Sequence, residues 1–324
     1  MGYNRCLPIL QSCGGEMKRL FLCIFVLVAG SVFAQSAPKR PKITGIDHVD
    51  FYTTDAAANE HLFTVVLGLE SVPPVEAGQT QRYKVGKQWV GYSPSPDPGS
   101  INRMDHVAFR TDNCEAMRRY LAANGIAVPD SVEKLKTGEH AFRVKDPEGH
   151  VIEFVQPTGV MLMKMHVAGK AEATPDPVSR RIIHAGFIVR DRAAEDHFYK
   201  DILGFHLYWY GGMTARTDWV SMQVPDGTDW LEFMLNQPEK PDQHVAGVMD
   251  HVSLGVADMK AAQAKLEAHG WTPHGEEQAK LGKDGKWQLN LYDPDQTRIE
   301  IMEFTPKEKP CCSEFQGKHP SEND

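Results

Sequence analysis

Four short segments with alternating apolar and polar residues recur along the chain, and each carries one histidine at the same place. Such alternation is typical of a strand with one buried face. A helical pattern follows each segment, and further strands follow the helix. The sequence therefore predicts four repeated units of strand, helix and several strands. The four segments are Asp47-His48-Val49-Asp50-Phe51, Asp105-His106-Val107-Ala108-Phe109, Ile183-His184-Ala185-Gly186-Phe187 and Asp250-His251-Val252-Ser253-Leu254.

Helix and turn signals give each unit its elements. Glycines directly after three of the helical patterns are typical helix ends. A hairpin is expected around Gly86-Lys87, and Asp-Pro turns introduce the last strands of the second and fourth units. The predicted helices span residues 56–67, 114–124, 193–203 and 259–269, and the predicted strands include 43–53, 82–85, 88–92, 219–224 and 230–235.

The spacing of the repeats divides the chain into two pairs of units. His106 precedes Glu153 by nearly the same number of residues as His251 precedes Glu300. A proline-containing stretch without strand alternation separates the pairs. We therefore expect an N-terminal domain over 43–157, a linker over 158–180, a C-terminal domain over 181–304 and a polar tail over 305–324.

Charge and hydropathy exclude some partners and indicate export. The 324 residues carry a formal net charge of −8, which provides no basic surface for nucleic acid, and no internal apolar run is long enough to cross a bilayer. Lys18-Arg19, the apolar run 20–29 and Val32-Phe33-Ala34 have the order of a signal peptide. We expect residues 1–34 to be removed, translation to begin at Met17, and the mature protein to be exported to a periplasm without a membrane anchor.

Two strand glutamates direct attention to metal chemistry. Glu153 and Glu300 each lie between apolar neighbours in a strand that follows an Asp-Pro turn. A carboxylate is costly to bury without a partner. Since the histidines recur in step with these glutamates, we expect the repeated units to supply metal ligands to shared points. Taken singly, His140 and His150 beside the first Asp-Pro turn are expected to be solvated, and the tail with Cys311-Cys312 is expected to be mobile.

The ordered set of motifs resembles the vicinal oxygen chelate superfamily, which includes glyoxalase I, extradiol dioxygenases and bleomycin-resistance proteins. The resemblance rests on the four histidine strands, on both Asp-Pro-turn-to-glutamate strands, and on the segment 198–205 with its echo at 62–69. It implies an α+β fold of four βαβββ modules, paired into two half-barrel domains. Two such pairs in one chain allow a monomer or a homodimer.

The resemblance also implies the ligand sets. In the C-terminal pair it gives His184, Glu232, His251 and Glu300, with Glu232 and Glu300 in catalytic roles; in the N-terminal pair it gives His48, His106 and Glu153. If Trp89 aligns with Trp230, Gly91 stands where Glu232 stands, and the N-terminal pair lacks a fourth ligand. Imidazoles and carboxylates bind divalent first-row ions such as Zn, Ni, Mn or Fe.

Three functions fit this reading. The first is a glyoxalase-like lyase or isomerase acting on a small substrate with vicinal oxygens through an enediolate. The second is a non-haem Fe(II) ring-cleaving dioxygenase, although Arg143 and Asn290 stand where the extradiol signature has a tyrosine. The third is a non-catalytic periplasmic protein that binds a small molecule. The sequence leaves the substrate and the metal open.

Overall fold

The computed structural model describes residues 38–97, 99–158, 176–275 and 278–324. The predicted signal peptide, the expected start at Met17 and most of the predicted linker lie outside these residues. Within the described part of the chain, no helix is both long and apolar enough to cross a membrane.

The first two units build one eight-stranded sheet, here called the N-terminal sheet. Its strand order is β2-β3-β4-β1-β5-β8-β7-β6, with β1 and β5 antiparallel at the centre and β4 and β8 parallel to them on either side. The strands are β1 (Ile43–Thr53), β2 (Glu70–Ser71), β3 (Gln81–Val85), β4 (Gln88–Pro94), β5 (Met104–Thr111), β6 (Glu133–Lys134), β7 (His140–Lys145) and β8 (Val151–Gln156).

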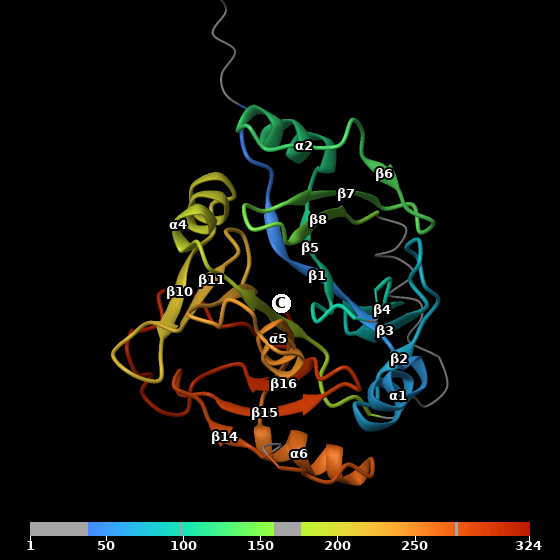
Figure 1. Ribbon diagram of the computed structural model, residues 1–324, viewed down its shortest axis with the longest axis vertical. Coiled ribbons are helices and arrows are strands. Elements are labelled where there is room, and N and C mark those ends of the chain that lie inside the picture. Colours follow the sequence, from blue (N-terminus) through green and yellow to red (C-terminus); the bar gives the residue numbers. More distant parts are fainter. Residues whose placement is uncertain (1–37, 98, 159–175, 276–277) are drawn as a thin grey trace, which may run out of the picture. The chain divides into compact units, whose positions relative to one another are not determined.

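The last two units repeat this arrangement in the C-terminal sheet, whose order is β10-β11-β12-β9-β13-β16-β15-β14. Two sheets of the same order confirm the predicted α+β fold of paired modules (Figure 1). The strands are β9 (Ile182–Ile188), β10 (His206–Gly211), β11 (Trp219–Gln223), β12 (Trp230–Met234), β13 (His251–Val256), β14 (Lys280–Leu281), β15 (Trp287–Tyr292) and β16 (Arg298–Glu303).

The helices begin at side-chain caps and differ from the prediction in one respect. α2 (Cys114–Ala123) and α6 (Met259–Ala268) are α-helices, but the predicted helices 56–67 and 193–203 change pitch midway. α1 (Ala56–Glu60) continues as the π-helix η1 (His61–Val66), and α4 (Arg192–Glu195) continues as η2 (Asp196–Ile202). The sequence also missed α5 (Gln243–Met249), which is capped by Asp242.

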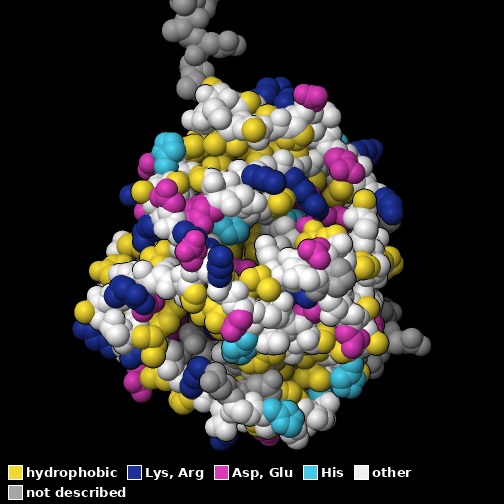
Figure 2. Space-filling model, in the orientation of Figure 1, with side chains coloured by type: hydrophobic (Ala, Val, Ile, Leu, Met, Phe, Trp, Pro, Cys, Tyr) yellow, Lys and Arg dark blue, Asp and Glu magenta, His cyan; other side chains and the backbone are white. Residues whose placement is uncertain are grey.

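One hydrophobic core runs through both sheets, so the two halves share buried contacts. Phe109 of β5 meets Phe205 edge to face with ring centroids 5.3 Å apart. Tyr120 of α2 donates a hydrogen bond to the carbonyl of Ile202 at 2.7 Å. Charged side chains of both signs are interspersed over the face shown in Figure 2.

The tail is not the mobile segment that the sequence predicts. The backbone N–H of Gln316 donates to the carbonyl of Tyr208, and the ring of Phe315 packs on Tyr208 with centroids 4.8 Å apart. Cys311 and Cys312 are joined by a disulfide bond, and the carbonyl of Cys311 accepts from the indole of Trp209. Apolar and backbone contacts with β10 therefore hold a segment whose composition is polar.

Candidate metal centres

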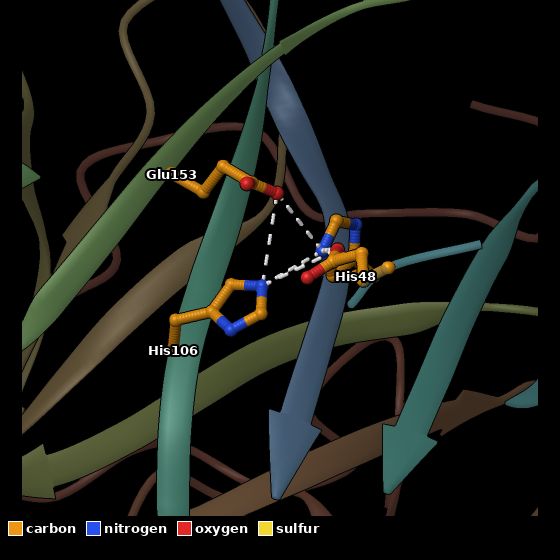
Figure 3. A group of neighbouring side chains, drawn as sticks. His48, His106 and Glu153 are labelled. Carbon is orange, nitrogen blue, oxygen red and sulfur yellow. Dashed lines mark hydrogen bonds and ion pairs between the residues drawn. The ribbon is translucent and has the colours of Figure 1, made fainter. Parts of the chain in front are cut away.

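The N-terminal sheet brings its three predicted ligands together at its centre. His48 comes from β1, His106 from β5 and Glu153 from β8, and their side chains point toward one another (Figure 3). The Nε2 atoms of His48 and His106 lie 2.9 Å apart, and Glu153 Oε2 lies 3.2 Å from His48 Nε2. All three residues are buried. His48 and Glu153 are each in register with Ala108 of β5, and His106 lies two residues before Ala108 on the same face, so neighbouring strands bring the three side chains together, as the repeat predicts.

A fourth carboxylate, which sequence reasoning missed, reaches the same point. Glu76 lies in the loop between β2 and β3, and its Oε1 is 2.9 Å from His48 Nε2 and 3.7 Å from His106 Nε2. The expectation that this half lacks a fourth ligand is therefore wrong. No strand alternation marks residue 76, because it lies in a Pro- and Gly-containing loop; only the strand residues could be found by periodicity.

Gly91 does stand where Glu232 stands, as the alignment of the tryptophans predicts. Trp89 pairs with His48, and Trp230 pairs with His184. A Cβ atom at Gly91 would come within 2.3 Å of Asp50 Oδ1 and Gln79 Nε2. Asp50 and the loop thus fill the space that a strand glutamate would need, and the loop supplies its own carboxylate.

Both N-terminal imidazoles are oriented by carboxylates. His48 Nδ1 lies 2.9 Å from Asp47 Oδ2, and His106 Nδ1 lies 3.0 Å from Asp105 Oδ2. Asp105 also accepts a 2.5 Å hydrogen bond from the hydroxyl of Tyr52. With Nδ1 donating to a carboxylate, each Nε2 presents its lone pair to the centre, which is the arrangement of histidines that bind metals.

The residues of this centre fit a divalent ion. Two Nε2 lone pairs 2.9 Å apart repel each other unless a cation or proton lies between them, and Glu153 Oε2 accepts no hydrogen bond although it is buried. Burial lowers the pKa of both histidines, but the hydrogen bonds to carboxylates raise it more, so their pKa stands well above the ordinary value. The site therefore favours positive charge at its centre.

A basic side chain and a cavity border the N-terminal centre. Arg143 Nε donates to Glu153 Oε1 at 3.0 Å, and Arg143 Nη2 pairs with Glu76. A cavity of about 430 Å³ opens here, lined by Glu76, Arg143 and Glu153 together with apolar Val75, Leu135 and Phe142. A small molecule can reach the candidate ligands through this cavity.

The C-terminal sheet also gathers its predicted ligands. The Nε2 atoms of His184 and His251 lie 3.0 Å apart, and Glu300 Oε2 lies 3.2 Å from His184 Nε2. Glu232 Oε2 is farther, at 3.8 Å from His184 and 3.6 Å from His251. Of these four residues, His184, Glu232 and His251 form a group whose ligand atoms all lie within 4.8 Å of one another, and Glu300 is not part of that group.

Each centre has an arginine beside one histidine, since Arg143 Nη2 lies 3.2 Å from His106 Nε2; the C-terminal centre differs in its buried lysine and in having no carboxylate at the Nδ1 atom of His251. Arg298 Nη2 lies 2.8 Å from His251 Nε2, the atom that a metal would use, because the His251 Nδ1 is already engaged with the carbonyl of Met249. Lys286 is buried and stands over the ring of Trp230 at 4.5 Å. The C-terminal centre therefore has two cations beside its histidines and carboxylates.

The electrostatics of the C-terminal centre follow from these contacts. Burial and Arg298 hold the pKa of His251 well below its ordinary value, and burial lowers the pKa of His184. Burial, with the Glu300 carboxylate, raises the pKa of Glu232 to about 8. This centre thus favours neutral histidines and a protonated Glu232 at neutral pH, and it attracts a further cation less than the N-terminal centre does.

His140 and His150, expected to be solvated, differ from each other. His140 lies half-buried in β7, whereas the ring of His150 stacks on Phe187 of β9 with centroids 4.2 Å apart and bonds to Asp146 at 2.7 Å. The expectation is wrong for His150, because a residue of the other half covers the turn on which it lies.

Sequence and structure comparisons agree with this geometry. The chain is 24% identical over 300 residues to the manganese-dependent 2,3-dihydroxybiphenyl 1,2-dioxygenase of Geobacillus genomosp. 3, a match that covers 82% of this chain and 92% of that protein. It is 33% identical over 92 residues to the uncharacterized protein YaeR of Escherichia coli, covering 28% of this chain and 71% of YaeR.

Solved structures share the fold at low identity. The Mn(II)-bound glyoxalase of Novosphingobium aromaticivorans superposes with a TM-score of 0.60 at 19% identity, over 81% of this chain and 83% of that one. A variant of homoprotocatechuate 2,3-dioxygenase from B. fuscum gives a TM-score of 0.58 at 19% identity, over 82% of this chain and 73% of that one.

The family profile described as Glyoxalase/Bleomycin resistance protein/Dioxygenase superfamily matches residues 45–154 and 181–301, which together make up more than half of the chain. Each match covers one of the two sheets and ends at or just after its strand glutamate, Glu153 or Glu300. The resemblance found in the sequence is confirmed: this chain belongs to the Glyoxalase/Bleomycin resistance protein/Dioxygenase superfamily.

Proposed function

We propose that this protein is an exported, divalent-metal-dependent enzyme, a glyoxalase-like lyase or isomerase that acts on a small substrate with vicinal oxygens through an enediolate. One observation carries the proposal: the two oriented histidines, Glu153 and the loop carboxylate Glu76 converge on one point beside a cavity. Export is supported by the order of basic, apolar and small residues before Gln35.

The N-terminal centre is the better candidate for catalysis. His48, His106, Glu153 and Glu76 would hold the ion there, and a divalent ion so bound would polarise two substrate oxygens as a Lewis acid. The C-terminal set His184, Glu232, His251 and Glu300 remains a second candidate; Arg298 would have to leave His251 before a metal binds there, as Arg143 would have to leave His106 in the N-terminal set.

Glu76 is the candidate for the proton-transferring group. The other three candidates stand on paired strands, whereas Glu76 stands on a loop and can withdraw without disturbing the sheet. With a substrate bound, the carboxylate of Glu76 would remove the proton from one substrate carbon and return it to the adjacent carbon, while the hydroxyl proton passes from one substrate oxygen to the other. Arg143, which contacts both Glu76 and Glu153, stabilises negative charge beside the substrate.

A ring-cleaving dioxygenase is the second candidate function, favoured by the relative from Geobacillus that matches 82% of this chain. If Glu76 withdraws, His48, His106 and Glu153 leave positions open for a diol and for O₂, as two-histidine, one-carboxylate sets do. Arg143 and Asn290 in place of the extradiol tyrosine argue against it. A non-catalytic periplasmic protein that binds a small molecule is the third.

Exchange of a substrate proton with solvent deuterium separates these functions. With Mn(II), Zn(II) or Ni(II) loaded, we expect a 2-hydroxy-ketone to exchange the proton beside its carbonyl, as followed by NMR. Glu76→Gln should slow this exchange about 100-fold or more while metal stays bound, because three ligands remain. Glu70→Gln, on the exposed strand before the loop, is the matched control and should exchange normally.

The other outcomes assign the protein differently. Consumption of O₂ with a catechol by the Fe(II)- or Mn(II)-loaded protein, without deuterium exchange, establishes the dioxygenase and overturns the isomerase proposal. Binding of a small molecule by protein that contains no metal, with neither reaction, establishes the binding protein.

A further inference from the structure

A third cluster of candidate metal ligands lies at the turn between β7 and β8 and shares no residue with the two sheet centres. Asp146 and His150 flank the turn between β7 and β8, and Glu195 is the last residue of α4 in the other half of the chain. Each residue offers a ligand atom, and these atoms all lie within 4.8 Å of one another. Neither the mechanism proposed above nor the repeat of the histidine strands uses these residues.

The cluster has two carboxylates, and only Asp146 has both of its oxygens hydrogen-bonded. Asp146 Oδ1 accepts the backbone N–H groups of Glu148 at 3.1 Å and His150 at 2.8 Å. Asp146 Oδ2 lies 2.7 Å from His150 Nδ1 and accepts from the hydroxyl of Tyr199 at 3.1 Å. Glu195 Oε1 accepts the backbone N–H of Glu148 at 3.1 Å. The side chain of Glu195 is fully buried, yet its Oε2 has no hydrogen-bond partner. A buried, unpartnered carboxylate oxygen beside a second carboxylate is costly unless a positive charge joins them.

His150 connects the buried carboxylates to an opening. A cavity of about 480 Å³ is lined by His150, Glu148, Phe187, Arg190 and Asp250 and also by His106 of the N-terminal centre, whereas Asp146 and Glu195 are not among its lining residues. Ions and water can therefore reach the imidazole from the cavity, and the cavity has room for the water that completes the coordination of a three-ligand site. Asp250 adds a negative charge to the cavity wall. Arg190 is the one arginine or lysine among the residues that line this cavity.

The duplicated half lacks the same set, so the cluster is not a requirement of the fold. Counted from the Asp-Pro turns, Asp293 matches Asp146 and Thr297 matches His150. Counted from the helix caps Asp55 and Asp191, Asn59 matches Glu195. Within the described residues, one of the two matching sets therefore has both the histidine and the glutamate, and the other set has Thr297 and Asn59 in their place.

We propose that Asp146, His150 and Glu195 bind a third divalent cation, which ties the β7–β8 turn of the N-terminal sheet to α4 of the other half. One imidazole and two carboxylates suit a first-row ion such as Zn²⁺ or Mn²⁺. The ligands come from both halves of the chain, so the ion stabilises the contact between them, and the site does not depend on which reaction the protein performs.

Zinc binding by the full chain tests the site. In His106→Ala/His251→Ala protein, which lacks a histidine of each sheet centre, equilibrium dialysis with elemental analysis should find one Zn²⁺ per chain at this cluster. Adding Glu195→Gln should remove that equivalent, and adding Glu115→Gln, an exposed glutamate on α2, should leave it. Glutamine keeps the bond to the N–H of Glu148, so the melting temperature in EDTA should stay within a few degrees.

Thermal unfolding supplies an independent readout. Zn²⁺ should raise the melting temperature of the double variant by several degrees, and Glu195→Gln should abolish this rise. If the double variant does not fold, single Glu195→Gln should hold one Zn²⁺ fewer than the unsubstituted protein. The proposal is overturned if Glu195→Gln binds as much Zn²⁺ as its parent, or if the folded double variant binds none and only a proton balances the carboxylates.

Discussion

The aspartates before His106 and His251 have different hydrogen-bond partners, and Asp105 is the one of the two that holds its histidine. It directly precedes His106 and holds the Nδ1 of that histidine, whereas Asp250, which directly precedes His251, instead accepts the backbone N–H of Ile188. Asp105→Asn should weaken metal binding at the N-terminal centre by about 10- to 100-fold, because the imidazole loses its orienting carboxylate. Equilibrium dialysis against Mn²⁺ measures the change.

Asp250→Asn is the matched control, since it changes the same residue type at the same place in the repeat. It should leave the N-terminal Mn²⁺ affinity unaltered. Equal affinity for Asp105→Asn and the unsubstituted protein would remove the orienting role that we assign to Asp105.

Asp293 provides a pH test that does not involve the sheet centres. Burial raises the pKa of Asp293 from 3.8 to about 7, although the hydrogen bond from the backbone N–H of Thr297 acts in the opposite direction. A raised pKa means that the folded protein prefers the protonated acid. Its contribution to stability is therefore fully present below about pH 4 and is lost as the pH rises through 7.

Asp293→Asn should accordingly flatten the pH dependence of stability. The difference in unfolding free energy between the variant and the unsubstituted protein should shift in favour of the variant by on the order of 2 kcal/mol as the pH rises from 4 to 8. Urea denaturation at both pH values measures this. Parallel pH profiles for the two proteins would show that Asp293 ionises normally.

The residues that sequence alone could locate are those on strands. His48, His106, Glu153 and their C-terminal counterparts follow a period of two and a repeat, so their shared face could be predicted. Glu76, Arg298 and His150 could not be assigned, because a loop position or a contact across the molecule decides what they touch. The same limit explains why the sequence favoured the C-terminal ligand set: the charge of Arg298 at His251 exists only in three dimensions.

At the scale of elements, local signals located most helices and strands but not their pitch or their packing. Caps and glycines fixed the ends of α2 and α6, whereas nothing in the pattern distinguishes η1 and η2 from α-helix. α5 is short, and its cap Asp242 is not followed by a long periodic pattern; the helix packs on β9 and β16. The tail is polar overall, so its few apolar anchors gave no periodic signal.

Removal of residues 310–324 tests the packing of the tail. Tyr208 and Trp209 are almost fully buried and would become exposed along with the lost contacts of Phe315. We expect a loss of about 2–4 kcal/mol of unfolding free energy, in proportion to the apolar surface exposed. Differential scanning calorimetry measures it. Glu314→Ala, whose side chain is 74% exposed, should change stability by less than about 0.5 kcal/mol; the same small effect from the truncation would mean that the tail is not packed.

At the scale of the whole molecule, Asp295 joins the two halves of the chain. It accepts hydrogen bonds from Thr53 and Thr54 of the first unit and pairs with the buried Arg103 at 3.1 Å. Asp295→Ala should cost about 3–5 kcal/mol, because it leaves the guanidinium of Arg103 buried without this carboxylate. Chemical denaturation measures the loss. Asp201→Ala removes an exposed ion pair with His197 and should be nearly neutral; an equally small effect at Asp295 would indicate that the halves do not depend on this contact.

Duplication has given the molecule two centres with the same strands and opposite electrostatics. The N-terminal centre surrounds its histidines with carboxylates, and the C-terminal centre brings Arg298 and Lys286 to its own. Since an arginine lies beside one histidine in each centre, the carboxylates of Asp47, Asp105 and Glu76 are what distinguish the N-terminal centre. We infer that the N-terminal centre binds the metal on which activity depends.

Elemental analysis of His106→Ala and His251→Ala, each with the unsubstituted protein beside it, tests this inference most directly. His106→Ala should lose one equivalent of divalent ion together with the deuterium exchange of the substrate, and His251→Ala should retain both. Loss of ion and exchange in His251→Ala, with both retained in His106→Ala, would contradict the account and return the catalytic centre to the C-terminal sheet.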